Sequence, residues 1–193
     1  MDRLPATHTL GSRGARKARR GLTLLELVLS FGVFLVGSLG FLQAIVLATK
    51  TGQVNRESAV ATAAARQAIE ALQAATFEEA YWRFNSDPGD DPATGVSPGS
   101  GIDVPGLKAL PGDPDGLAGE ILFPTVSAGG PLELREDVQN AAMGMPRDLN
   151  GDGAIDSANH KDDYRLLPVI VRFRWVGASG PASMEFRTLL ADY

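Results

Sequence analysis

Residues 19–27 read RRGLTLLEL, and they join a basic leader to an apolar stretch that continues to Ala48. Glu26 is the only formally charged side chain among the 27 residues from Leu22 to Ala48. A helix needs roughly 20 apolar residues to cross the hydrocarbon core of a bilayer. The stretch therefore predicts a membrane-spanning helix that begins at Leu22 or Thr23.

The charges beside this stretch predict its orientation. Five basic side chains precede it with no acid among them: Arg13, Arg16, Lys17, Arg19 and Arg20. Lys and Arg flanking a span favour the cytoplasmic side. We therefore expect residues 1–21 in the cytoplasm and the C-terminus outside it.

Glu26 is unusual because placing an ionisable side chain within the membrane costs free energy. Such a residue is therefore expected to have a function. The partner that would neutralise it is an amine. The alternative is a purely local role: Glu26 would lie at the level of the lipid headgroups, where a carboxylate also suits the positive end of the helix dipole.

Residues 21–26 resemble the N-terminus of type IV prepilins and type II secretion pseudopilins. The family consensus is glycine, a hydrophobic residue, Thr or Ser, Leu, a hydrophobic residue and Glu, and GLTLLE fits it at every position. Residues 36–43, VGSLGFLQ, are also similar to a segment of the minor pilins of the type IV pilus modification class. The resemblance covers the leader and the apolar helix.

The resemblance implies a processing and assembly pathway. Prepilin peptidase would cleave after Gly21, Leu22 would become the methylated N-terminal residue, and Glu26 would neutralise a terminal amine during assembly. The implied partners are that peptidase, other pilin or pseudopilin subunits, the inner-membrane assembly platform and the membrane. The implied location is the bacterial inner membrane, with a single pass and the C-terminus extracytoplasmic, and then a periplasmic or surface filament.

Two other fates of the N-terminus remain open from the sequence. Val46–Ala48 would pass as a signal-peptidase site, although the apolar stretch before it exceeds the roughly 7 to 15 residues of an ordinary secretory signal. Cleavage there would release a secreted domain such as a hydrolase. An uncleaved leader would leave a single-pass, membrane-anchored, calcium-dependent binding or adhesion module that does not polymerise.

The rest of the chain predicts an α+β fold, which the resemblance specifies as pilin-like, with a long N-terminal helix packed on a small antiparallel sheet. Residues 53–85 contain no Pro or Gly, and apolar side chains at Ala61, Ala65, Ile69 and Leu72 recur at helical spacing. We therefore expect one helix over residues 22–75, of which 22–48 span the membrane, and an extracytoplasmic head over 76–193. Within the head, the many Pro and Gly residues of 86–118 predict a long loop.

Alternation of apolar and polar residues predicts the strands of the head. Residues 120–123 and 132–135 flank a Gly-Gly-Pro turn and predict one strand pair. Residues 166–190, with a turn at 177–181, predict a C-terminal hairpin with one apolar and one charged face. Such a hairpin must cover something hydrophobic, and the Ala-rich helix is the nearest candidate.

A possible metal site lies between these strand pairs, in residues 148–163. Oxygen ligands at positions 1, 3, 5, 7 and 9 of a short loop, with glycine at position 6, are typical of calcium binding. Position 12 holds an amide where a bidentate carboxylate is usual, so one of two later acids would complete the set. The predicted ligands are Asp148, Asn150, Asp152, the carbonyl of Ala154, Asp156, Asn159, Asp162 and Asp163.

Pro146 precedes this loop and a β segment follows it, so the flanking helices of an EF-hand are not expected. We predict a structural calcium ion that clamps a loop. The alternative is an Asp/Asn/Gly turn without an ion.

The composition of the chain argues against several classes of function. Residues 22–193 carry a net side-chain charge of −10, which argues against a nucleic-acid surface, since that requires clustered basic residues. The chain has no cysteine, so neither a disulfide nor thiol chemistry is available. Its two histidines, His8 and His160, do not form a conventional zinc motif, and the sequence contains no catalytic constellation. We therefore do not expect an enzyme.

Overall fold

The computed structural model describes residues 23–91, 97–127 and 130–192. The chain divides into two compact units, Met1–Val46 and Leu47–Tyr193. The predicted long helix is confirmed as α1, Leu24–Ala74, which comprises 51 residues. Leu22, the first residue of the expected helix, lies outside the described residues.

A second helix, α2 at Phe77–Phe84, was not predicted. Thr76 separates it from α1 with an extended backbone, φ −63° and ψ 146°. At the start of α2, the Tyr164 hydroxyl donates a hydrogen bond to the Phe77 carbonyl at 2.5 Å and the two rings are in contact. The first residue of α2 thus packs on a residue 87 positions later in the chain, a contact that no local pattern indicates.

The main sheet is antiparallel, with the strand order β1-β2-β5-β6. Its strands are β1 at Gly101–Ile102, β2 at Gly119–Leu122, β5 at Leu166–Gly177 and β6 at Gly180–Ala191. The predicted C-terminal hairpin is confirmed, since β5 and β6 pair along their whole length, with Val171 opposite Phe186. The loop predicted over 86–118 contains the short strand β1.

The predicted pairing of 120–123 with 132–135 is wrong. Both segments contain a strand, but β2 pairs with β1 and β5, whereas β4 at Glu133–Leu134 pairs with β3 at Thr125–Val126 in a separate two-stranded sheet. The buried Ile121 of β2 lies opposite Val171 of β5, which gives β2 an apolar partner strand. The remaining short element is a 3₁₀ turn at Ala141–Met143.

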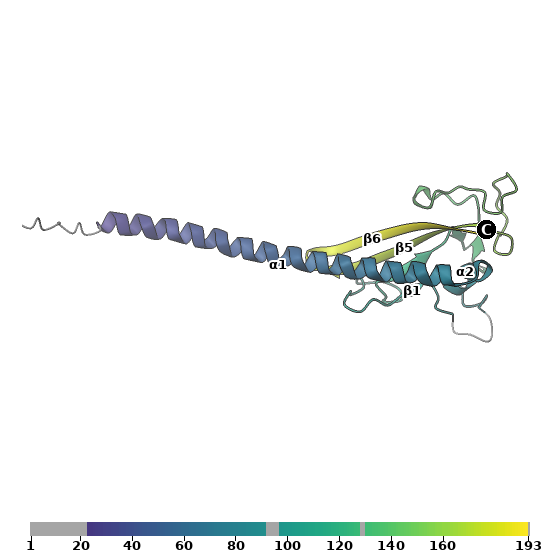
Figure 1. Ribbon diagram of the computed structural model, residues 1–193, viewed down its shortest axis with the longest axis horizontal. Helices are drawn as coiled ribbons and strands as arrows, with labels where there is room; N and C mark the ends of the chain where they lie inside the picture. The colour runs from purple at the N-terminus through teal and green to yellow at the C-terminus, as the bar shows by residue number, and fades with distance from the viewer. Residues whose placement is uncertain (1–22, 92–96, 128–129, 193) are drawn as a thin grey trace, which may run out of the picture. The chain divides into compact units, whose positions relative to one another are not determined.

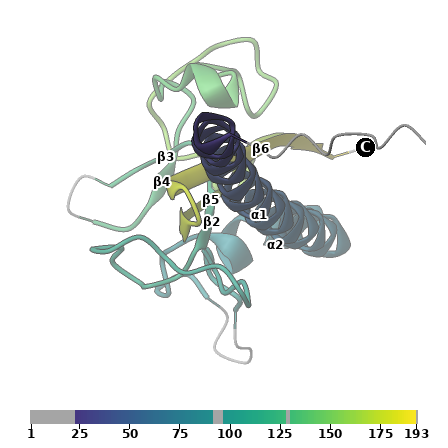
Figure 2. The ribbon, with the colours of Figure 1, turned by 90° about the vertical axis from the view of Figure 1, so that its left-hand side faces the viewer.

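In the unit Leu47–Tyr193, the β5–β6 hairpin lies along the second half of α1 (Figures 1 and 2). The helix contributes a stripe of small side chains to the core, with Ala61 and Ala65 fully buried and Leu72 nearly so. Ile69, which was expected in this stripe, is only half-buried. The hairpin contributes four buried side chains of β5 to the same core: Val169, Val171, Phe173 and Trp175. The long helix packed on a small antiparallel sheet is therefore present.

The long loops of this unit lie on opposite sides of the hairpin in both views (Figures 1 and 2). Residues 98–118, in teal, are on one side, and residues 135–163, in green, are on the other. The green side carries the acidic loop that the sequence singles out.

Candidate functional site

Residues 23–26, the described part of the motif at residues 21–26, lie at the start of α1. The Thr23 hydroxyl oxygen accepts a hydrogen bond from the Glu26 backbone N–H at 3.2 Å, as in a helix N-cap. Thr23 and Glu26 have the spacing of a capping box, so both residue types also favour a helix start here. Glu26 is exposed. The predicted cleavage and methylation residues, Gly21 and Leu22, lie outside the described residues.

Residues 24–46 of α1 are apolar and exposed. Among the described residues, α1 is the one helix long and apolar enough to cross a membrane. Leu25, Phe31, Phe34 and Phe41 are each more than 60% exposed. A surface of this kind requires lipid or another apolar partner, because large exposed apolar patches mark interaction sites.

The acidic loop, residues 148–163, begins with three predicted ligands whose oxygens accept backbone hydrogen bonds. Asp148 accepts from Gly151 N–H at 2.6 Å and from Gly153 N–H at 2.8 Å. Asn150 accepts from the N–H of Asp152, which in turn accepts from the N–H of Ala154 at 2.8 Å. These turns bend the backbone into a compact loop.

Two glycines make this bend possible. Gly151 and Gly153 have φ of 81° and 87°, in the left-handed region that only glycine adopts readily. The glycine predicted at the sharp bend of the calcium pattern therefore has the expected backbone conformation.

Asp163 joins this group from the far end of the acidic loop. The side-chain nitrogen of Asn150 lies 3.4 Å from an oxygen of Asp152 and 3.4 Å from Oδ2 of Asp163. Carboxylates 11 residues apart in sequence therefore converge on Asn150. Of the two acids considered for completing the ligand set, Asp163 is the one in contact with Asn150, and the side chains of both acids are exposed.

Two further predicted side-chain ligands, Asn159 and Asp156, are engaged elsewhere. Asn159 Oδ1 accepts hydrogen bonds from Leu134 N–H at 3.1 Å and Lys161 N–H at 3.2 Å, so it fastens the acidic loop to β4. Asp156 Oδ1 accepts from Ala158 N–H at 2.7 Å and lies 3.1 Å from His160 Nε2. Asn159 is thus a structural side chain, and Asp156 belongs to a neighbouring cluster.

The buried side chain of Glu136, which the sequence does not indicate as a site residue, holds the acidic loop in place. Its side chain is 1% exposed. Oε1 accepts hydrogen bonds from Leu149 N–H at 2.6 Å and Asn150 N–H at 3.3 Å, and Oε2 accepts from Asp156 N–H at 3.1 Å. One buried carboxylate therefore satisfies three backbone donors, and no motif around residue 136 signals this.

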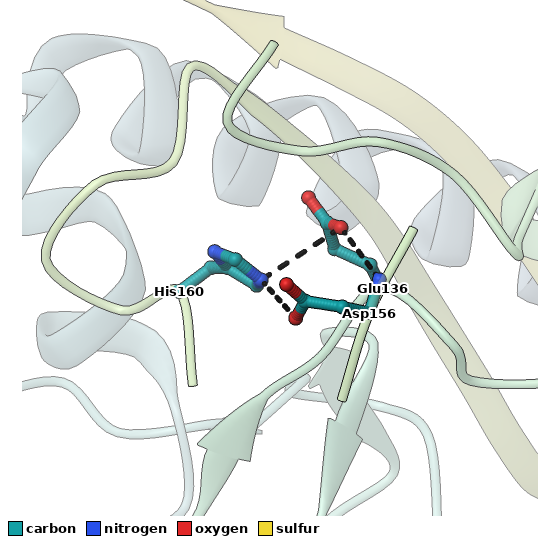
Figure 3. Close-up of side chains that lie close together, drawn as sticks. All are labelled: Glu136, Asp156 and His160. Carbon is teal, nitrogen blue, oxygen red and sulfur yellow. Dashed lines mark hydrogen bonds and ion pairs between the residues drawn. The ribbon is translucent and has the colours of Figure 1, made fainter. Parts of the chain in front are cut away.

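His160 lies against the carboxylates of Glu136 and Asp156 (Figure 3), and a third carboxylate, that of Asp163, lies at its other ring nitrogen. Its Nε2 is 3.1 Å from Asp156 Oδ1 and 3.7 Å from Glu136 Oε2, and its Nδ1 is 3.1 Å from Asp163 Oδ1. Burial alone lowers the pKa of His160, but the hydrogen bond to Asp156 and the charges of Glu136 and Asp163 outweigh it and raise the net pKa above its usual value. The spacing of the two histidines in the sequence does not indicate this cluster.

Two acids of the acidic loop, Asp148 and Asp156, have a pKa below the usual value of an aspartate. Hydrogen bonds from backbone N–H groups, that of Gly153 foremost, lower the pKa of Asp148. The N–H of Ala158 and then His160 lower the pKa of Asp156. Chemically, the loop offers oxygen ligands for a hard cation at Asp148, Asn150, Asp152 and Asp163, and a mixed nitrogen and oxygen set at Glu136, Asp156 and His160.

Comparison with known proteins gives no match: no family model, no curated protein and no solved structure matches the chain. Its function must therefore be inferred from its own residues and their geometry.

Proposed function

We propose that this chain is a minor pilin or pseudopilin, a structural subunit of a type IV pilus or a type II secretion pseudopilus. Prepilin peptidase cleaves it after Gly21, and the mature subunit enters the filament through its N-terminal helix. The observation that carries the proposal is α1 itself. It is one continuous helix of 51 residues whose apolar residues 24–46 are exposed and whose later residues form the core of an antiparallel sheet domain.

Two features of the helix start support this proposal. The motif Gly21–Glu26 provides the peptidase site, and Glu26 lies in the first turn of α1 where a carboxylate can meet a terminal amine. Before assembly the subunit waits in the bacterial inner membrane, with the basic leader in the cytoplasm and the sheet domain outside it. In the filament, neighbouring subunits replace lipid around the apolar residues.

The sheet domain contributes a calcium-stabilised loop in this proposal. Asp148, Asn150, Asp152 and Asp163 provide the side-chain ligands. Carboxylate oxygens of Asp152 and Asp163 both lie 3.4 Å from the side-chain nitrogen of Asn150, and the Gly153 N–H holds Asp148 in the same turn. Calcium accepts six to eight oxygens at flexible angles, so backbone carbonyls and water complete its shell. The ion clamps a loop in a domain that has no disulfide, and it takes no part in chemistry.

Replacing Glu26 tests the assembly role directly. In Glu26→Ala, membrane insertion should be unchanged, because removing a charge makes the apolar span more favourable. Incorporation into sheared filaments should fall at least about tenfold, since an unpaired amine then remains buried in the assembly. Membrane insertion is measured by resistance to alkaline extraction, and incorporation by immunoblotting of the filament fraction.

Glu70→Ala is the matched control, because Glu70 is an exposed carboxylate on the same helix. It should leave both insertion and incorporation unchanged. Normal incorporation of Glu26→Ala would contradict the assembly role and favour a membrane-anchored binding module that does not polymerise.

A further inference from the structure

We propose that His160 Nε2, Asp156 and Glu136 form a binding site for a divalent d-block metal ion, with Zn²⁺ as the probe. One ligand atom from each residue lies within 4.8 Å of the other two (Figure 3). None of these three ligands belongs to the calcium set proposed at Asp148, Asn150, Asp152 and Asp163. Asp163 borders both sites, with Oδ2 toward Asn150 and Oδ1 toward His160 Nδ1. The site does not depend on the assembly pathway.

The spacing of the ligand atoms matches a tetrahedral ion. Zinc binds nitrogen and oxygen ligands at about 2.0 to 2.2 Å, so two ligands of a tetrahedral site lie roughly 3.3 to 3.5 Å apart. His160 Nε2 is 3.1 Å from Asp156 Oδ1 and 3.7 Å from Glu136 Oε2. These two distances therefore lie within a few tenths of an ångström of the tetrahedral values, the Asp156 and Glu136 ligand oxygens lie within 4.8 Å of each other, and water can supply the fourth ligand.

The imidazole is held in the orientation that metal binding requires. His160 Nδ1 lies 3.1 Å from Asp163 Oδ1. When Nδ1–H donates to this carboxylate, the lone pair of Nε2 faces Asp156 and Glu136. A carboxylate behind a metal-binding histidine fixes the tautomer in the same way in known zinc sites. Asp163 is thus a positioning residue for this site.

Burial distinguishes the cluster from a surface group of acids. His160 is 4% exposed and Glu136 is 1% exposed. The second oxygen of Glu136, Oε1, is held by Leu149 N–H at 2.6 Å, so the Glu136 side chain is already oriented. Asp156 is 52% exposed and leaves a path by which the ion enters from solvent.

The donor set favours a d-block metal over calcium. Imidazole nitrogen suits zinc, copper, nickel and iron, whereas calcium takes oxygen ligands. A bound ion would join the acidic loop to the segment after β4, because Glu136 follows β4 and the other two ligands lie within the loop. In a chain without cysteine, the bound ion would cross-link these two segments, as a disulfide does in other proteins.

Zinc binding by the full chain in detergent tests the proposal. The chain is titrated with Zn²⁺ against a chromogenic chelator, with calcium in excess so that oxygen-only sites are filled. We expect one zinc per chain. His160→Gln and Asp156→Asn should each weaken zinc binding at least tenfold, and Asp163→Asn should weaken it about 10- to 100-fold, as for other groups that orient a ligand.

Asp162→Asn is the matched control, because it removes an exposed acid from the same loop without touching the cluster. Its zinc affinity should equal that of the unmodified chain. Asp156→Asn keeps the test valid if His160→Gln fails to fold, because Asp156 is half-exposed. Absence of stoichiometric zinc, or equal zinc affinity in Asp156→Asn, His160→Gln and Asp162→Asn, would overturn the proposal and leave His160 as an ion-paired structural side chain.

Discussion

Glu57 of α1 links the helix to the tip of the β5–β6 hairpin. Its carboxylate accepts a hydrogen bond from Trp175 Nε1 at 3.1 Å and another from Ala178 N–H at 3.1 Å. The Trp175 side chain is 3% exposed, so its indole N–H has little access to water as a replacement partner. The contact therefore stabilises the packing of the hairpin on the helix.

Glu57→Ala should lower the free energy of unfolding of the sheet domain by about 1 to 3 kcal/mol, because it leaves a buried indole N–H without an acceptor. Chemical denaturation of the full chain in detergent, followed by Trp fluorescence, measures the change. Glu70→Ala on the exposed face of the same helix should change it by less than about 0.5 kcal/mol. Equal effects of the two substitutions would show that the Glu57 hydrogen bonds contribute nothing.

Individual site residues could be predicted where their spacing in the sequence is typical of a metal-binding loop. Asp148, Asn150 and Asp152 could be grouped because alternate residues of a glycine-containing turn face the same centre. Glu136 and His160 could not, because a buried carboxylate that binds backbone donors 13 and 20 residues away leaves no periodic pattern. Asn159 fits the pattern by position, yet it is used to fasten the acidic loop to β4.

At the scale of elements, β2 and β5 approach closely at Gly119. A methyl group on Gly119 would lie 2.5 Å from Cε1 of Phe173, whose side chain is fully buried. The buried ring would have to shift against its neighbours in the core, so the packing of the sheet favours glycine here.

Gly119→Ala should therefore destabilise the sheet domain by about 1 to 3 kcal/mol through overpacking. The matched control is Gly52→Ala in α1, where an added methyl group meets nothing within 4 Å. This control should stabilise the helix by up to about 1 kcal/mol, because alanine has the higher helix propensity. Thermal unfolding of both variants measures the two opposite changes, and a neutral Gly119→Ala would refute the close-packing argument.

Helices and strands could be predicted where the alternation of apolar and polar residues extends over many positions. The α1 helix and the β5–β6 hairpin each follow one periodicity over many residues, and both are confirmed. Of the short strands, β2 and β4 were predicted but wrongly paired with each other, and β1 and β3 were not predicted, because two- to four-residue strands carry little pattern and do not specify their partners. The separate helix α2 was not predicted, and its first residue contacts Tyr164, which is distant in sequence.

At the scale of the whole molecule, the sheet domain relies on packing and on its loops for stability, since the chain has no cysteine. The acidic loop is held by Glu136 and by β4, and a bound calcium ion would add to these contacts. The α+β arrangement follows from the sequence because its two longest elements each have an apolar face that must be buried. The identity of a bound ion does not follow, because the same acids also form a hydrogen-bonded turn.

Calcium should raise the melting temperature of the full chain, because an ion that binds only the folded state stabilises it by mass action, by about 2.7 kcal/mol at 100 times the Kd. Differential scanning fluorimetry in detergent, with calcium and with a chelator, measures the shift. Replacing both Asp148 and Asp152 with Asn should abolish it, whereas Asp162→Asn should keep it. An unmodified chain whose melting temperature ignores calcium would contradict the calcium proposal.

The central claim concerns the N-terminus, and intact mass with N-terminal sequencing tests it most directly. The chain is recovered from membranes of cells with and without prepilin peptidase. We predict a mature chain that begins at methylated Leu22 when the peptidase is present, and a full-length chain when it is absent. A chain that begins at Met1 despite the peptidase, or at Thr49, would contradict the account and remove the basis for Glu26 as an assembly residue.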